Sequence, residues 1–249
     1  MSGAWGIWAL GAGDFTKLLG ALAVGCMLST GVAARAGSLE PRLDSVGAGE
    51  SFRDGAMAEF RLMGFGLDAR MVDFDEMGPR GDALADNLGV GKAAVFSSVQ
   101  GAGPRAKCLV GLRMARWANA PERNLVAAGA GGGVEAAPMW RIMARHELGH
   151  CALAQLATSY GKPSTRQAEA FADVFALSWT ALRDRNGMSL AKGFAAARAR
   201  TSSADGDHAT GLAIDSWLRA GSTGNPCMDA WTAAPLDARP AQVACPASR

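Results

Sequence analysis

The chain has 249 residues, of which 49% are hydrophobic and 19% are charged, and its formal net charge is +2 at pH 7. This composition excludes a disordered or fibrous protein and leaves room for one good-sized domain or two small ones. The lysines and arginines are spread along the chain rather than gathered into a basic block, so nucleic acid is not an expected partner.

The N-terminal residues follow the order of a secretory signal peptide. Lys17 precedes an apolar run over residues 18–28, and Ala34-Arg35-Ala36 forms a small-x-small site. A positive flank, a short apolar core and such a site are the pattern that signal peptidase cleaves. We therefore expect residues 1–36 to be removed by cleavage after Ala36. Residues 37–249 would then form a single exported domain, either periplasmic or secreted.

Two other interpretations of this N-terminal segment stay open. One is an uncleaved anchor in the inner membrane, and the other is a lipoprotein site at Cys26. The apolar run is interrupted by glycines and falls short of the roughly 20 apolar residues that a membrane span needs. The residues before Cys26 lack the usual leucine, and the apolar run continues past the cysteine. We expect no stable membrane span after cleavage.

Export to an oxidising compartment would allow the cysteines to form disulfides. Without the signal peptide, four remain: Cys108, Cys151, Cys227 and Cys245. An even number in an oxidising compartment predicts two disulfides, and four cysteines allow three pairings. We favour Cys227 with Cys245, in a proline-rich tail, and Cys108 with Cys151, joining a strand to a helix. Buried free thiols are the alternative. A zinc site made of cysteines is disfavoured because the chain has no C-x-x-C.

The first half of the mature chain mixes short apolar stretches with Gly, Asp and Arg. Apolar residues at helical spacing predict a helix over residues 50–63. Short strands are predicted over residues 93–99, 108–114 and 124–128. A glycine-rich run over residues 129–133 lacks the Lys-Ser/Thr of a phosphate-binding loop, which favours a flexible connector.

The second half is predicted to be mainly helical. A helix should cover residues 139–157, because a proline precedes it and the only breaker inside it is one glycine. Ser164 and Gln167 form a capping box that predicts the start of a second helix, which should end near residue 185. Further helices are expected over residues 189–200 and 212–220. The last 25 residues are rich in proline and predict an irregular tail held by cysteines.

The first of these helices carries His146-Glu147-Leu148-Gly149-His150. Residues four apart lie on the same face of a helix, so His146 and His150 can present two imidazoles to one zinc ion. Glu147 projects beside that face and is placed to accept a proton from a water that the ion activates. A chance HExxH on an amphipathic helix is the alternative. Against it, the chain has only three histidines, and two have this spacing.

The next helix carries two acidic residues, Glu169 and Asp173, which also share one face at a spacing of four. Their neighbours are mostly apolar, and two unpaired carboxylates in such surroundings are costly to bury. Ligation of a metal by one and a hydrogen bond from the other to a ligating histidine would remove that cost. A pair of solvated surface acids is the alternative.

This HExxH followed by Glu-Ala-Phe-Ala-Asp about twenty residues later resembles the gluzincin arrangement of the thermolysin-like metallopeptidases. The resemblance covers about thirty residues. It implies that His146, His150 and Glu169 bind Zn²⁺, that Glu147 is the catalytic base, and that Asp173 orients a ligating histidine. Asp173 as the third ligand, with Glu169 outside the metal shell, stays open.

The resemblance also implies the fold and the activity. We expect an α+β, zincin-like domain in which a small mixed sheet comes first, followed by the active-site helix and a mainly helical C-terminal half. The expected activity is zinc-dependent hydrolysis of peptides or proteins. Zincins bind peptide as an added strand on a sheet edge, and residues 108–114 are the candidate edge. A non-enzymatic envelope protein with a structural zinc site is the alternative function.

The third histidine, His208, lies in an Asp-Gly-Asp-His sequence. Thermolysin-like enzymes have a downstream histidine that stabilises the oxyanion with the help of an aspartate. By that resemblance His208 is a candidate catalytic residue, with Asp205 or Asp207 orienting its ring. A loop histidine that caps the following helix is an equally weighted alternative.

Overall fold

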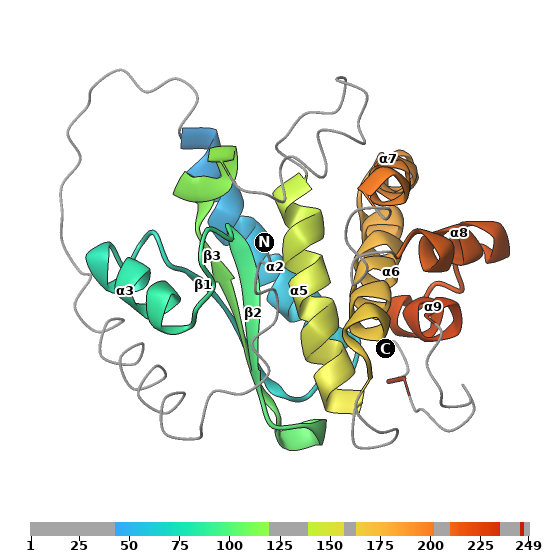
Figure 1. Cartoon of the computed structure of the whole chain (residues 1–249), viewed down its shortest axis with the longest axis horizontal. Helices are drawn as coiled ribbons and strands as arrows, with labels where there is room; N and C mark the ends of the chain where they lie inside the picture. The colour runs from blue at the N-terminus through green and yellow to red at the C-terminus, as the bar shows by residue number, and fades with distance from the viewer. Residues whose placement is uncertain (1–42, 120–138, 157–162, 202–209, 235–244, 247–249) are drawn as a thin grey trace.

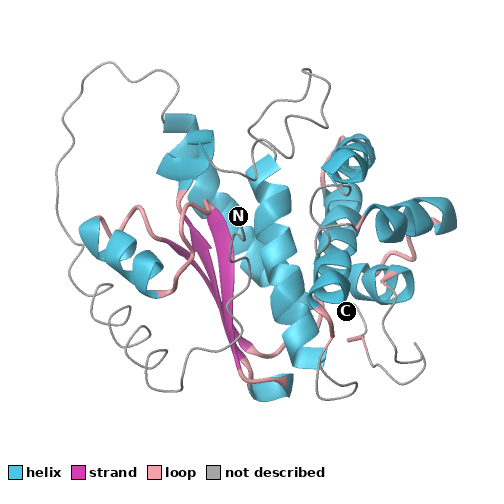
Figure 2. Cartoon of the chain, viewed as in Figure 1, coloured by secondary structure: helices cyan, strands magenta, loops and turns pink. Residues whose placement is uncertain are grey.

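Seven α-helices and a three-stranded mixed sheet make up the described part of the chain (Figures 1 and 2), which confirms the predicted α+β class. The computed structural model describes residues 43–119, 139–156, 163–201, 210–234 and 245–246. The predicted signal peptide with Cys26, the strand over residues 124–128, the glycine run and His208 with its two aspartates lie outside these residues. Those predictions therefore stay predictions.

The sheet has the strand order β1-β3-β2. Strand β1 (Asp68–Asp73) pairs in parallel with β3 (Lys107–Leu112), and β2 (Val95–Gln100) pairs antiparallel to β3 on the other side. The expectation that residues 108–114 offer a free edge to a substrate is therefore wrong. Both edges of β3 are already hydrogen-bonded, and β2 and β1 are the outer strands.

Helices cover both faces of this sheet. Helix α2 (Leu43–Leu62) and α5 (Met139–Leu156) lie on one face, and α3 (Pro79–Asn87) lies on the other (Figure 1). Strand β1 and helix α3 were not predicted. In β1, exposed charged residues alternate with buried Ala69 and Met71, so the strand depends on its pairing with β3 rather than on strand-forming residues.

Helix α5 lies between the sheet and α6 (Thr165–Arg183), and both were predicted within two residues at their ends. The predicted capping box at Ser164 and Gln167 is present. Every residue from 168 to 180 of α6 is buried, which makes α6 a core helix. Buried Arg145 of α5 binds Asp184, at the end of α6, through two ion-pair contacts of 2.8 and 3.1 Å.

Three further helices pack around α6: α7 (Gly187–Thr201), α8 (Gly211–Ala220) and α9 (Pro226–Ala233). The prediction of an irregular tail is wrong at α9. There the Asn225 side chain accepts hydrogen bonds from two backbone N–H groups of the first turn, and Pro226 begins the helix, so local capping starts a helix inside a proline-rich segment. Short 3₁₀ helices, η1 (Gly103–Arg105) and η2 (Met114–Asn119), flank β3.

Two disulfides are present, Cys108–Cys151 and Cys227–Cys245. Both favoured pairings are confirmed. The first joins β3 to α5 and the second joins α9 to the described residues near the C-terminus. Such bonds are typical of proteins in oxidising compartments. In the described part of the chain, no helix combines the length and the apolar character needed to cross a bilayer.

Candidate metal centre

His146 and His150 lie one turn apart on α5, and their Nε2 atoms are 3.2 Å apart. His146 is 3% exposed, and the side chain of His150 is 12% exposed. The helical spacing of four places both rings on one face, as the sequence predicts. The two Nε2 atoms therefore point to one position between α5 and α6.

Glu169 approaches the same position from α6. One of its carboxylate oxygens is 3.3 Å from Nε2 of His146 and the other is 3.4 Å from Nε2 of His150. Ligand atoms at about 2.0–2.1 Å from a tetrahedral zinc ion would be roughly 3.3 Å apart. Within the described residues, these three side chains form the group that could hold a metal ion.

Close packing of the two helices makes this approach possible. A Cβ added at Gly149 would lie 2.8 Å from the Cα atom of Ala172, so only glycine fits at this point of α5. Gly149 precedes His150 in the sequence, and Ala172 precedes Asp173. The close contact between the two helices is thus formed by residues next to members of the candidate site.

Asp173 contacts the opposite edge of the His146 ring. Its Oδ1 atom accepts a hydrogen bond of 2.8 Å from Nδ1, and it is not a member of the metal-ligating group. In the neutral form of the ring, a proton on Nδ1 leaves the lone pair of Nε2 facing His150 and Glu169. Of the two acidic residues named from the sequence, Glu169 belongs to the group that could hold a metal ion, and Asp173 contacts a histidine of that group.

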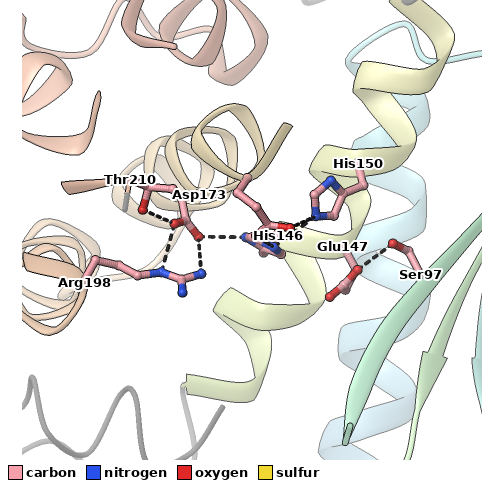
Figure 3. A network of polar contacts seen from close by, with 8 residues as sticks. Ser97, His146, Glu147, His150, Asp173, Arg198 and Thr210 are labelled. Carbon is pink, nitrogen blue, oxygen red and sulfur yellow. Dashed lines mark hydrogen bonds and ion pairs between the residues drawn. The ribbon is translucent and has the colours of Figure 1, made fainter. Parts of the chain in front are cut away.

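Asp173 is fully buried, and two more side chains bind it (Figure 3). Arg198 of α7 contacts Oδ2 at 3.0 Å and donates to Oδ1 at 3.1 Å. The hydroxyl of Thr210, which precedes α8, donates to Oδ2 at 2.6 Å. Three elements besides α6 therefore meet at one carboxylate, and each of its oxygens has partners.

These contacts shift two pKa values strongly. Burial alone would lower the pKa of His146, but the charge of Asp173 and hydrogen bonds to Asp173 and Glu169 raise it to about 10. Burial alone would raise the pKa of Asp173, but the charges of Arg198 and His146 lower it to about 2. The surroundings of the His146 ring are thus strongly negative and favour a positive charge there, as a proton or a metal ion.

His150 lacks such support. Its Nδ1 atom is buried and has no hydrogen-bond partner in the part of the chain that the structure describes. Among the described residues, Asp173 sets the tautomer of His146 through its contact with Nδ1.

Glu147 projects away from α6 toward the sheet (Figure 3). It is 6% exposed, and its Oε2 atom accepts a hydrogen bond of 2.5 Å from the hydroxyl of Ser97 on β2. The residue next to His146 thus contacts an outer strand of the sheet. Its carboxylate is separate from the metal-ligating group.

The fold brings five of the six predicted site residues together, and His208, the sixth, lies outside the described residues. Three contacts were not predicted: Ser97, Arg198 and Thr210. Ser97 could have been found from the sequence, because it is a polar residue in a predicted strand with a valine two residues away on each side, Val95 and Val99. Arg198 and Thr210 carried none, because their partner Asp173 is distant in sequence.

Comparisons with protein-family models, with curated protein sequences and with solved structures found no match.

Proposed function

We propose that the chain is an exported zinc-dependent metallopeptidase with a zincin-like arrangement. The observation that carries this proposal is the convergence of His146, His150 and Glu169, with the carboxylate of Glu147 beside them but not among them. Two disulfides support an oxidising compartment, periplasmic or extracellular.

The donor set fits zinc. Two imidazole nitrogens and one carboxylate oxygen are the ligands of one class of catalytic zinc sites, which keep a fourth position for water or substrate. A structural zinc site has four protein ligands. No fourth histidine, cysteine or carboxylate joins the group within the described residues. This favours catalysis over the alternative of a structural zinc site in a non-enzymatic envelope protein.

The chain's own groups have distinct tasks in this proposal. When bound, zinc lowers the pKa of a water molecule to near neutral and polarises a substrate carbonyl. Glu147 would act as the general base, which takes a proton from the attacking water and gives it to the leaving amine. Asp173 holds His146 in the tautomer that offers Nε2, and Arg198 and Thr210 hold Asp173.

We further propose that a peptide substrate binds as an extra strand along the outer edge of β2. This strand is an edge of the sheet, and its Ser97 contacts Glu147. A peptide hydrogen-bonded to this edge would run past the general base. This replaces β3 as the candidate, because β3 is the central strand.

The test combines metal analysis with peptide hydrolysis. Purified wild-type protein should carry about one zinc per chain and cleave members of a peptide library. Glu147→Gln should keep the zinc and lose activity by about 10²–10⁴-fold, since it cannot accept a proton. Glu76→Gln, which changes an exposed carboxylate that pairs with Arg53, is the control and should behave as wild type.

Two results would refute the proposal. One is wild-type protein without zinc after refolding in excess zinc, and the other is Glu147→Gln protein that cleaves peptide at the wild-type rate. Zinc that stays bound while neither protein cleaves any peptide would instead favour the structural zinc site.

A further inference from the structure

Ser97 lies on the face of β2 that is turned toward α5. In the antiparallel pairing, Ser97 stands opposite Val110 of β3, and both neighbouring pairs on that face consist of residues of the larger core, to which apolar residues of α5 also belong. Residues directly opposite each other in a sheet point to the same face. Ser97 is therefore a polar residue in a row of apolar ones, and it is half-buried.

Its neighbour Ser98 provides a contrast on the same strand. Ser98 stands opposite Leu109, which belongs to the smaller core beneath α3 on the other face of the sheet. Ser98 is 6% exposed and is therefore the more deeply buried of the two serines. Only Ser97 has a side-chain contact with Glu147.

The hydrogen bond between Ser97 and Glu147 joins β2 to α5, and these two elements must keep a fixed distance during the proposed reaction. Glu147 has three rotatable side-chain bonds, and a free glutamate side chain loses up to about 2 kcal/mol of rotamer entropy when it is ordered. The Ser97 hydroxyl holds one oxygen, Oε2, at 2.5 Å. The other oxygen, Oε1, has no hydrogen bond to another described side chain and is left to accept a proton.

We propose that Ser97 is a positioning residue that orders the general base Glu147 from the strand on which the substrate binds. This inference rests on the proposed function. The hydroxyl does not touch the reacting atoms, and it acts by keeping one carboxylate oxygen on β2 so that the other faces the water. Because the strand that binds the peptide also holds the base, the distance between the scissile bond and the base is set by one element.

The experiment compares wild type, Ser97→Ala, Ser97→Thr and Ser98→Ala on the fastest-cleaved peptide of the library, with zinc content measured for each. Ser97→Ala should keep its zinc and a KM within about twofold of wild type. Its kcat should fall about 10–100-fold, the range for a misplaced catalytic group. Ser97→Thr keeps the hydroxyl and should restore kcat to within about threefold. Ser98→Ala should match wild type.

A double variant separates positioning from a merely structural contact. If Ser97 acts only through Glu147, Ser97→Ala should cause no further loss of kcat in the Glu147→Gln background. If the wild-type enzyme is active, any of three results would overturn the inference. These are a wild-type kcat for Ser97→Ala, a kcat for Ser97→Thr as low as that of Ser97→Ala, and loss of zinc from Ser97→Ala. Absence of zinc or of hydrolysis in wild type would refute the proposed function, and the contact would then be structural only.

Discussion

Asp173 shows how one buried carboxylate can serve both the fold and the site. It has no exposed surface, yet His146, Arg198 and Thr210 all bind it. Leaving such a charge unpaired in the interior would cost several kcal/mol, so the three contacts stabilise the fold and also fix the ring of His146.

In the proposed zinc site, replacement of Asp173 by asparagine should weaken zinc binding. The variant Asp173→Asn keeps the shape but loses the charge that holds the Nδ1 proton of His146, and loss of such a partner reduces metal affinity about 10–100-fold. A competition titration against a chelator of known affinity measures the dissociation constant. Asp86→Asn, which changes an exposed carboxylate on α3, is the control and should stay within about twofold of wild type. Equal affinities for Asp173→Asn and wild type would contradict the assigned role.

At the scale of elements, the contact between α5 and α6 determines whether the three side chains of the candidate metal centre meet. His146 and His150 belong to α5, and Glu169 belongs to α6, so a shift of one helix against the other separates these side chains. Gly149 permits the close approach. The Cys108–Cys151 disulfide, next to His150, joins α5 to β3 on its other side. Helix α5 is therefore constrained from both sides at the metal centre.

Substitution of Gly149 by alanine should be destabilising although alanine is the better helix former. Alanine gains about 1 kcal/mol of helix propensity. Its Cβ, however, would lie 2.8 Å from the Cα atom of Ala172. Overpacking against backbone costs about 1–3 kcal/mol and would push α6, with Glu169, away from α5. Chemical denaturation should show a lower free energy of unfolding, and zinc affinity should fall.

Gly193 in α7 is the matched control for this prediction. It is also a helical glycine, but an added Cβ would meet nothing within 4 Å. Gly193→Ala should therefore raise the free energy of unfolding by up to about 1 kcal/mol and leave zinc affinity unchanged. Equal gains in stability for both variants would show that the close approach at Gly149 is unimportant.

At the scale of the whole molecule, the last two helices are held to α6 by a second buried carboxylate, Asp229 of α9. Its Oδ2 accepts hydrogen bonds from Ser178 of α6, Trp217 of α8 and Ser222, and its Oδ1 accepts two from Thr223. Burial raises the pKa of Asp229, but the hydrogen bonds from Ser178, Ser222 and Thr223 outweigh it and leave the pKa below its ordinary value. Helix α9 also carries the Cys227–Cys245 disulfide.

This lowered pKa predicts how stability depends on pH. A carboxyl whose pKa is lower in the folded state contributes stability above its unfolded pKa of about 3.9, and that contribution is lost as pH falls through the folded value. Asp229→Asn should therefore lower the free energy of unfolding by about 2–3 kcal/mol at pH 6, where the charged acceptor is lost. The difference from wild type should shrink below pH 4.

Denaturation curves of wild type and Asp229→Asn at several pH values measure the difference in their free energies of unfolding. The other carboxyls titrate in both proteins, so their contributions cancel in this difference. Asp215→Asn, on the exposed side of α8, is the control and should follow wild type at every pH. A stability difference for Asp229→Asn that stays constant from pH 6 to pH 3 would contradict the prediction.

The amino-acid sequence by itself determined the features that depend on neighbours along the chain. The spacing of His146 and His150, the capping box at Ser164 and the helix over residues 212–220 follow from helical periodicity and local hydrogen bonds, and the structure confirms them. The same periodicity placed Glu169 and Asp173 on one face of α6.

Only the tertiary structure decided which residues meet across elements. It places Asp173 on the Nδ1 side of His146 and Glu169 on the Nε2 side, a choice that depends on how α6 packs against α5. It makes β3 central and β2 an edge, and it brings Ser97 to Glu147. Strand order and contacts between distant residues arise from the packing of the whole core, which the local sequence pattern does not encode.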